Sequence, residues 1–181
     1  MSAKGGEITV VHPATVCGHS RTGHILDGQP LVELIRNLVL GKLTAVPGTA
    51  QHWLPLVTVD YLVELVAACA FDPAMAGEEL LALDAQTPNL RELLVQVAQP
   101  LGLKPPRHHI SLRLLKWLLS IPLVARFMNT KPEALDFIQT TRFDTAAVEQ
   151  FANRHGLVKP DIRQALRHTA TFVNSCFIAK G

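Results

Sequence analysis

Short apolar runs alternate with amphipathic stretches in the first hundred residues. The runs at residues 7–11, 56–59 and 79–83 are rich in aliphatic and β-branched residues and have the length of buried strands. Between them, apolar residues return at steps of three and four, as at residues 31–38, which is the period of one helix face. Alternating strands and helices predict an α/β arrangement in this part of the chain.

The pattern changes in the second half, where helical periods follow one another without strands. Helices are predicted at residues 110–128, 132–138, 145–155 and 160–177. An independent α/β domain usually has a larger sheet than three short strands can form. The first predicted strand also begins as early as residue 7. The sequence therefore resembles an α/β fold that starts in its middle and turns mostly α.

Charge and cysteine content exclude several classes of function. Lys and Arg number 17 against 15 Asp and Glu, and the basic residues are scattered, so no nucleic-acid surface is indicated. Three widely spaced cysteines without a CxxC pair favour neither disulfides nor a zinc site, and they fit a reducing cytoplasm. The apolar stretch 110–128 contains four interrupting residues, so no membrane span is predicted. Those four are Arg113, Lys116, Pro122 and Arg126.

The densest candidate chemistry lies at residues 12–24, after the first strand. Gly18 and Gly23 have the spacing of a phosphate-binding loop, but His24 and Ile25 stand where such a loop needs Lys and Ser or Thr. A second interpretation is a metal site, although its spacing matches no known pattern. Its ligands would be His12, Cys17, His19 and His24. The third is a ligand-binding loop at the C-terminal end of a parallel strand.

This segment resembles a known family. The sequence HPATVCGHSRTG is similar to the RP-[ST]-x-[VI]-x-G-[DH]-S-x-T-G stretch of extended short-chain dehydrogenases, closest to their thioester-reductase and fatty-acyl-reductase (male-sterility-like NAD-binding) branch. Downstream, LPLVTVDYLVELVAACA and TTRFDTAAVEQFANRHGLVKPDI resemble later segments of that branch, in the same order. The resemblance covers roughly residues 7–175. It rests on several similar segments that occur in the family's order, and no single motif carries it.

The resemblance implies a Rossmann-like fold, an acyl thioester or carbonyl substrate, and NADP as cofactor in a complete enzyme. It implies that the nicotinamide lies beside Pro13, Ala14, Thr15 and Val16. Substrate-side positions are expected at His19, Ser20, Arg21 and Trp53. Arg21 has the chemistry to meet a phosphate or carboxylate, with a solvated loop residue as the alternative. Trp53 is expected either near the substrate mouth or as a plug in the core.

Two hallmarks of the family do not occur in these 181 residues. No Gly-rich turn follows a strand, and the catalytic Tyr-x-x-x-Lys pair is absent, because the sole tyrosine is Tyr61 and residue 65 is leucine. We therefore expect residues 1–104 to be the C-terminal portion of an NAD(P)-binding domain and residues 105–181 a helical substrate-side subdomain. Such a chain would carry no catalytic residue and would be inactive alone. It would form a homo-oligomer or pair with a separate N-terminal half.

Two alternatives remain open at this stage. The chain could be a non-catalytic interaction or oligomerisation module, or a small metal-dependent enzyme that uses the histidine cluster. Asp60, at the start of a helix, reads as its N-cap. The apolar stripe of residues 110–128 is interpreted as a packing face, with the wall of an acyl channel as the second interpretation.

Overall fold

The computed structural model describes residues 8–128 and 132–178, with side chains as far as Cys176. The strands are β1 (Val10–Pro13), β2 (Thr15–Cys17), β3 (Val46–Pro47), β4 (Leu56–Thr58), β5 (Glu79–Ala82) and β6 (His109–Ile110). The α-helices are α1 (Pro30–Val39), α2 (Val59–Phe71), α3 (Leu90–Ala98), α4 (Leu112–Leu119), α5 (Pro122–Met128), α6 (Ala146–Arg154) and α7 (Ile162–Val173). Shorter turns are the 3₁₀ helices η1 (Pro73–Met75), η2 (Gln99–Leu101) and η3 (Pro132–Phe137) and the π-helical η4 (Asn174–Ile178).

All six strands pair in parallel, as three two-stranded ladders. β1 pairs with β5, β2 with β4, and β3 with β6. The first two ladders are continuous through Ala14, whose amide donates to Ala82 O at 3.0 Å, while the next amide, that of Thr15, donates to Pro55 O at 3.1 Å. One extended segment thus changes partner at Ala14 and ties the two ladders together.

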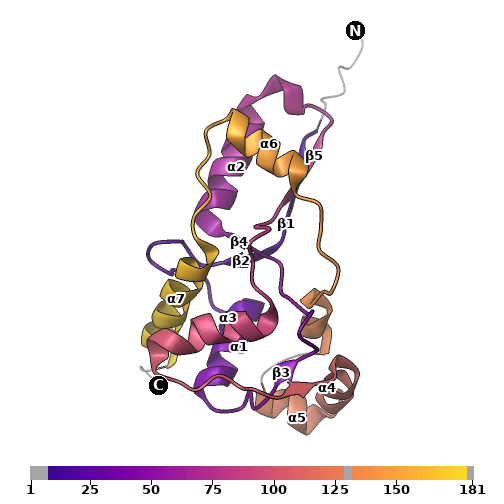
Figure 1. The fold of residues 1–181 in the computed structure, drawn as a ribbon, viewed down its shortest axis with the longest axis vertical. Helices are drawn as coiled ribbons and strands as arrows, with labels where there is room; N and C mark the ends of the chain where they lie inside the picture. Colours follow the sequence, from indigo (N-terminus) through magenta and orange to yellow (C-terminus); the bar gives the residue numbers. More distant parts are fainter. Residues whose placement is uncertain (1–7, 129–131, 179–181) are drawn as a thin grey trace.

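The helices divide around these ladders into two groups (Figure 1). α2 and α6 flank β1 and β5 in the upper part of that view, and α1, α3 and α7 gather in the lower part. We call the buried apolar residues of α2, α6 and β5 the upper core, and those of α1, α3 and α7 the lower core. The two cores hold separate clusters of buried side chains, which meet where β2 and β4 run between them.

The lower core is built from helices that each present one apolar face. Leu31 and Ile35 of α1, Leu93 of α3, and Leu166 and Ala170 of α7 are 0% exposed. α1 begins at Pro30. Proline lacks an amide hydrogen, but the first residue of a helix has no intrahelical acceptor for one, so proline is tolerated there. Gly41 follows the helix in the left-handed conformation at φ 67°.

The fold class predicted from the sequence is confirmed, since helices predominate over a few short parallel strands. Several element boundaries were wrong. The first strand begins at Val10, while Glu7 of the predicted strand lies outside the described residues. The segment after the first strand, for which a ligand-binding loop was one interpretation, contains β2. Its three residues are too few to give a period, and parallel pairing with β4 makes them a strand.

The predicted helix at residues 110–128 is two helices. α4 ends at Leu119 and α5 begins at Pro122, because proline has no amide to donate and disfavours helical conformation in the residue before it. The predicted helix at residues 132–138 is the 3₁₀ helix η3. None of the helices in residues 8–128 and 132–178 is both long and apolar enough to cross a membrane.

Candidate functional site

The loop that follows β2 is a compact turn pressed against α7. The amide of His19 donates to His24 O at 2.9 Å, and the amide of Gly23 donates back to His19 O at 2.8 Å. Gly23 has φ 70°, and a Cβ there would lie 2.1 Å from His168 O on α7. A Cβ on Gly18 would lie 2.5 Å from Gly23 O. Glycine is therefore required at both positions, for close contact of the loop with itself and with α7.

Ser20 and Asp60 fix this loop to the start of α2. The Ser20 hydroxyl donates to Asp60 Oδ2 at 2.5 Å, and the Ser20 amide donates to Asp60 Oδ1 at 3.0 Å. The N-cap of α2 is Thr58, without a side-chain cap, so the prediction that Asp60 is the N-cap was wrong. The carboxylate of Asp60 instead serves the neighbouring loop, which the sequence around Asp60 does not reveal.

The pKa of Asp60 indicates what its contact with Ser20 does. Partial burial raises the pKa of Asp60, but the hydrogen bonds from the Ser20 hydroxyl and amide outweigh it, so the pKa lies below its ordinary value. A carboxylate with a lowered pKa is a weak base at neutral pH, and it has little capacity to deprotonate a serine. Ser20 is therefore oriented by Asp60 rather than activated as a nucleophile.

His168 of α7 closes the loop from the other side. Its Nδ1 lies 2.7 Å from Ser20 O. A carbonyl oxygen only accepts, so Nδ1 carries the hydrogen in this contact. The sequence analysis missed His168, because one histidine on an amphipathic helix carries no distinguishing signal.

A polar cavity of about 420 Å³ lies beside this arrangement. Loop 18–24, the first turns of α2, and residues 156–168 form its walls. Its ionisable lining residues are Arg21, Asp60, Tyr61, Glu64, Asp161 and His168. The guanidinium of exposed Arg21 is the group best suited to hold a carboxylate or phosphate there, because it donates in a fixed fork. The cavity can therefore orient the polar end of a ligand.

The structure brings together some of the residues expected from the sequence and separates others. Ser20 and Arg21 line the polar cavity, whereas His19 does not line it and accepts a hydrogen bond from the Arg21 amide at 3.2 Å. Pro13 is exposed at the end of β1. Ala14, Thr15 and Val16 are half-buried, and Ala14 and Val16 pack against the upper core. None of residues 13–16 lines the polar cavity.

Trp53 lies elsewhere and is 1% exposed. Its indole nitrogen donates to Thr141 O at 3.1 Å, and the Arg142 guanidinium stacks over its ring at 3.9 Å from the centroid. Its backbone pairs with Gln139 in both directions. The burial agrees with the interpretation of Trp53 as a plug, which here holds residues 139–142 against the body of the protein.

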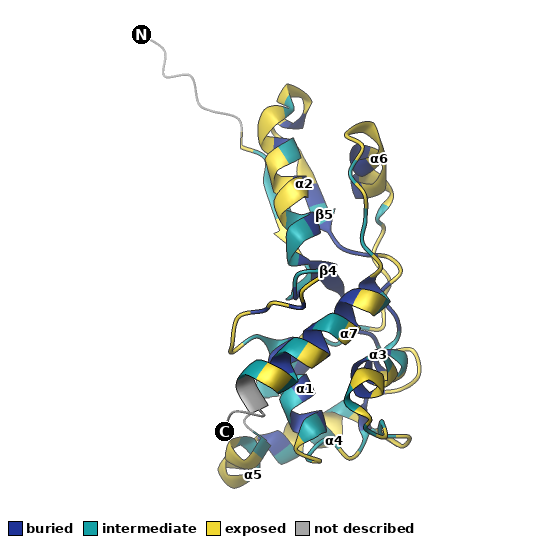
Figure 2. Cartoon of the chain, turned by 90° about the vertical axis from the view of Figure 1, so that its left-hand side faces the viewer, coloured by how far each residue is buried: buried dark blue, intermediate teal, exposed yellow. Residues whose placement is uncertain are grey.

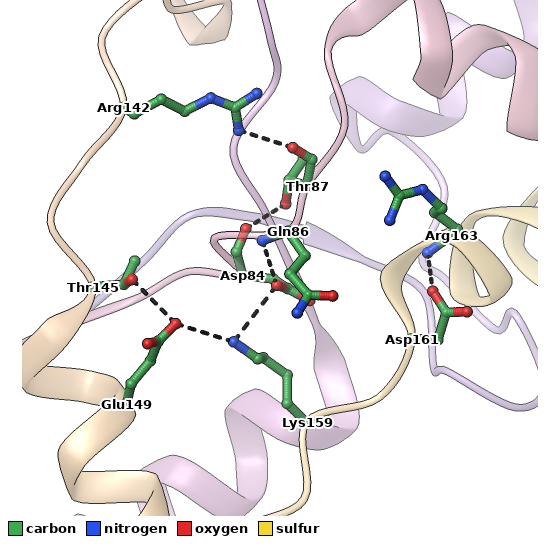
Figure 3. Close-up of polar contacts among 9 residues, drawn as sticks. All are labelled: Asp84, Gln86, Thr87, Arg142, Thr145, Glu149, Lys159, Asp161 and Arg163. Atoms are coloured by element: carbon green, nitrogen blue, oxygen red, sulfur yellow. Dashed lines mark hydrogen bonds and ion pairs between the residues drawn. The ribbon is translucent and has the colours of Figure 1, made fainter.

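A second group of polar residues lies at the C-terminal end of β5 (Figure 3). Asp84 is 5% exposed, and its Oδ1 accepts from the Gln86 amide at 2.8 Å and lies 3.7 Å from Lys159 Nζ. Lys159 Nζ also lies 3.3 Å from Glu149 Oε1. Burial raises the pKa of Asp84, and the Gln86 amide and the charge of Lys159 oppose this without reversing it. This ion pair joins buried Asp84 to half-buried Lys159 in the region where open α/β sheets bind ligands.

Arg142 joins the same group through Thr87. It donates to Thr87 O at 2.8 Å, and the Thr87 hydroxyl donates to Asp84 O at 2.7 Å (Figure 3). The sequence analysis missed this group. One signal was available, since Asp84 directly follows a predicted strand. Lys159 and Arg142 lie in later segments, and the sequence pattern does not show that these segments fold back against the sheet.

The histidine and cysteine positions considered for a metal do not converge. Cys17 is 0% exposed, and burial raises the pKa of its thiol to about 12. His12 lies 3.3 Å from Glu79 on the neighbouring strand. Across the part of the chain that the structure describes, no three His, Cys, Asp or Glu side chains are grouped so as to hold a metal ion.

The first turns of the helices that follow the strands do not suit a dinucleotide pyrophosphate. Helix N-termini bind phosphate groups through free amides and a positive partial charge. Here α1, α2 and α3 carry Glu33, Asp60 and Glu92 in their first turns, and each carboxylate opposes an anion. The N-termini of α1, α2 and α3 are therefore poorly suited to bind a pyrophosphate.

Comparison with known proteins finds relatives of this chain by fold alone. No family model and no curated protein matches the sequence. Among solved structures, the terminal R domain of the myxalamid PKS–NRPS pathway aligns with 98% of this chain and 46% of its own, at a TM-score of 0.73 and 15% identity. The thiolation–reductase di-domain of an archaeal non-ribosomal peptide synthetase aligns with 95% of this chain and 37% of its own, at 0.60 and 13%.

A third neighbour was solved with a cofactor. RMD from Pseudomonas aeruginosa, complexed with NADPH, aligns with 93% of this chain and 48% of its own, at a TM-score of 0.53 and 13% identity. The chain thus spans about half the length, or less, of these structures. The expectation from the sequence is confirmed at the level of fold: this chain has the fold of part of a terminal reductase domain.

Proposed function

We propose that the chain is the substrate-side part of an NAD(P)H-dependent reductase that acts on an acyl thioester or carbonyl, and that it is inactive alone. The observation that carries the proposal is that almost the whole chain aligns with about half of a terminal R domain. In this proposal NADP is held mainly outside these 181 residues. Residues 13–16 meet its nicotinamide end, and the polar cavity beside Arg21 orients the polar part of the substrate.

Two properties of the chain support this division of labour. The carboxylates in the first turns of α1, α2 and α3 leave no suitable cradle for a pyrophosphate. The single tyrosine, Tyr61, lines the polar cavity but is 4% exposed, burial raises its pKa, and residue 65 is leucine where the family's catalytic pair has lysine. The groups that hold the cofactor and protonate the substrate therefore belong to a complementary polypeptide segment.

The test is to co-express the 181 residues with the polypeptide encoded immediately upstream of Met1 and to follow NADPH at 340 nm with a neutral acyl thioester. The co-expressed pair is expected to oxidise NADPH, and the purified chain alone is expected not to. Turnover by the chain alone would disprove its inactivity. A pair that forms a complex but consumes no NADPH would disprove the reductase function.

A matched pair of variants tests the polar cavity in the same assay. Arg21→Ala is expected to lower kcat/KM about tenfold, since a hydrogen bond to a charged group contributes about 1.5–3 kcal/mol. Arg107→Ala, which removes an exposed arginine that does not line the polar cavity, is expected to change nothing. Equal kinetics for the two variants would exclude Arg21 from substrate binding.

An interaction module is the second candidate function, and exposed apolar side chains favour it. Trp117 of α4 is 62% exposed, and Leu123 and Phe127 of α5 are 79% and 62% exposed. Apolar groups gathered on neighbouring helices are typical of a surface that another protein covers. Light scattering tests this candidate in its self-associating form, which predicts a dimer or larger species of the chain alone; a compact monomer would contradict that form.

A further inference from the structure

The helix α4 is apolar on two sides, and only one of them is covered. On the inner side Leu119 is buried, where α4 packs against η3. On the outer side Leu114 and Trp117 are exposed, as is Ile121 just past the end of the helix. These three residues recur at steps of three and four, so they form one stripe. Packing within the chain uses one apolar side of a helix, so the outer stripe points to a partner outside the chain.

The helix α5 extends this exposed surface. α4 and α5 contact each other and lie together at the lower end of the molecule (Figure 1). Leu123 and Phe127 of α5 are four residues apart, share one side of the helix and are both exposed. Figure 2 shows that α5 is largely exposed. The α4–α5 face is defined here by Leu114, Trp117, Ile121, Leu123 and Phe127.

The charges around the α4–α5 face are mainly positive. Residues 93–132 contain six Lys and Arg residues and no Asp or Glu. Arg113 and Arg126 are exposed on the two helices. Lys42 reaches α5 from the segment after α1, where its Nζ lies 4.6 Å from the centroid of the Phe127 ring and donates to Phe127 O at 2.6 Å. The ring and the carbonyl are neutral, so they leave the charge of Lys42 uncompensated.

The acidic residues nearby lie on the inner side of α4. Asp136 of η3 lies 2.9 Å from Lys116 Nζ, so this cation has a carboxylate partner. Glu133 of η3 lines a cavity together with Leu115, on the buried side of the helix. Arg113 is four residues before Trp117 and therefore shares its outer side. The exposed apolar stripe of α4 is thus accompanied by positive charge.

This charge argues against a second copy of the chain as the partner. A two-fold dimer through the α4–α5 face would set the same patch against itself, and its arginines would repel. A membrane that contains anionic lipids offers negative headgroups above a boundary that accepts aromatic and aliphatic side chains. A fluid lipid surface also deforms around projecting side chains, whereas a protein partner would need a matching shape.

We propose that the α4–α5 face binds the surface of an anionic membrane. Its apolar side chains insert at the headgroup boundary, and Lys42, Arg113 and Arg126 lie among the lipid phosphates. The attachment is peripheral rather than membrane-spanning. The proposal does not depend on the reductase function, and none of these residues lines the polar cavity. It differs from the interaction module considered above in its partner, which is lipid rather than protein.

Sedimentation with vesicles tests the proposal on the full chain. The vesicles are phosphatidylcholine alone, or phosphatidylcholine with one third phosphatidylglycerol. The anionic vesicles are expected to bind at least about tenfold more tightly, and high salt is expected to weaken the binding because it screens the headgroup charge. Equal binding to both kinds of vesicle, or binding to neither, overturns the proposal.

Insertion is tested with the same vesicles made from lipids brominated in the acyl chains, since bromine quenches tryptophan that it contacts. Quenching of Trp117 is expected, whereas Trp53 is 1% exposed and is protected. Trp117→Ala is expected to remove the quenching and to weaken binding about tenfold, because the largest side chain of the face is lost. Phe71→Ala on α2, an exposed aromatic at the other end of the molecule, is the control and is expected to change neither. Sedimentation without quenching would reduce the contact to charge attraction and overturn the insertion.

A second matched pair tests the positive charges. Arg113→Gln is expected to weaken binding to anionic vesicles about fivefold, the equivalent of about 1 kcal/mol for one basic residue near such a surface. Arg154→Gln removes an exposed arginine of α6 and is expected to leave binding unchanged. Both arginines are exposed, so neither change opens a core. Equal binding by the two variants would exclude Arg113 from the contact. A dimer that Trp117→Ala converts to monomer, without vesicle binding by wild type, would assign the face to self-association instead.

Discussion

The lower and upper cores differ in how completely their helices are covered. In the lower core, α1, α3 and α7 turn their apolar faces toward one shared cluster. In the upper core, α2 buries Tyr61, Leu65 and Cys69 but also leaves Val63 at 61% and Phe71 at 88% exposure. Figure 2 shows the alternation of buried and exposed residues along α7 and the largely exposed outer side of α2. An amphipathic helix needs one covered face, whereas α2 has apolar residues on two.

The sheet shows the same difference. β1 pairs with β5 along one edge and, within residues 8–128 and 132–178, no strand pairs with its other edge. An open edge next to exposed apolar side chains is a ready surface for another strand. The comparison teaches that the lower core resembles the inside of a finished domain, while the upper core resembles one side of a larger one. In the proposed reductase, the complementary segment covers this side.

The largest effect is expected from opening the lower core. Leu166→Ala on α7 is expected to lower the free energy of unfolding by about 2–5 kcal/mol, because it leaves a cavity at a fully buried position. Leu65→Ala, equally buried in the upper core, is expected to cost less, since neighbours near an open surface collapse more easily. Urea unfolding measures both, with Leu26→Ala, 69% exposed, as the neutral control. A larger loss for Leu65→Ala would reverse the comparison.

The next effect concerns the loop that α7 holds. Gly23→Ala is expected to cost about 2 kcal/mol or more, because the left-handed conformation disfavours alanine and the new Cβ meets His168 O at 2.1 Å. Gly28→Ala has the same conformational problem at φ 80° but no atom within 4 Å of its Cβ. It is expected to cost about 1 kcal/mol. The difference in urea midpoints isolates the contact, and equal losses would show that the contact adds nothing.

Asp60→Asn is expected to destabilise the protein by about 1 kcal/mol at pH 7, because it weakens two hydrogen bonds at a partly exposed site. Its native pKa is lowered, so the stabilisation exists above the ordinary value of 3.8 and is lost as pH falls through the native value. Wild type and Asp60→Asn should therefore converge in acid. A constant difference between pH 7 and pH 3 would contradict this.

Asp84 is expected to show the opposite pH dependence. The pKa of Asp84 is raised in the native state above the ordinary value of 3.8. As pH rises above 3.8, the unfolded chain therefore loses this proton before the native protein does. The free energy of unfolding falls over this range, until pH has passed the native pKa. Asp84→Asn should remove that fall, while Lys159 keeps Glu149 as a partner. Urea unfolding at a series of pH values measures it. A wild-type fall retained in the variant would assign the effect to another group.

The smallest effect is a difference in thiol labelling. Cys17 of the lower core and Cys69 of the upper core are both buried, whereas Cys176 is half-buried. In native buffer a disulfide reagent is expected to label Cys176 first. In urea below the unfolding midpoint, Cys69 is expected to label before Cys17, because the less covered region opens at lower cost. Mass spectrometry of the labelled peptides gives the order, and earlier labelling of Cys17 would break the comparison.

Most of the fold followed from the sequence because local rules govern it. Pro30 and Gly41 mark the ends of α1, and apolar periods locate α2, α3 and α7. Strands of two or three residues, such as β2 and β6, have no period to detect and exist only through pairing with distant segments. Their prediction would need the tertiary structure.

The candidate site was partly predictable for the same reason. Ser20 and Arg21 lie in a loop that follows a strand, and that position indicates ligand binding. His168 and Lys159 reach the ends of the strands only after α6 and α7 fold back, which no local pattern encodes. Trp53 could not be placed from its neighbours, because its burial depends on residues 139–142.

The contact between His168 and Ser20 has a consequence for synthesis. It joins residues 148 positions apart, and α7 also completes the lower core that residues near the start of the chain begin. Contacts between such distant residues slow folding, because a long loop must close before they form. During translation, the early strands and α1 emerge well before the helix that covers them. Until then their apolar faces are open to aggregation and to chaperones, so the rate-limiting event in vivo is expected to be the arrival of α7.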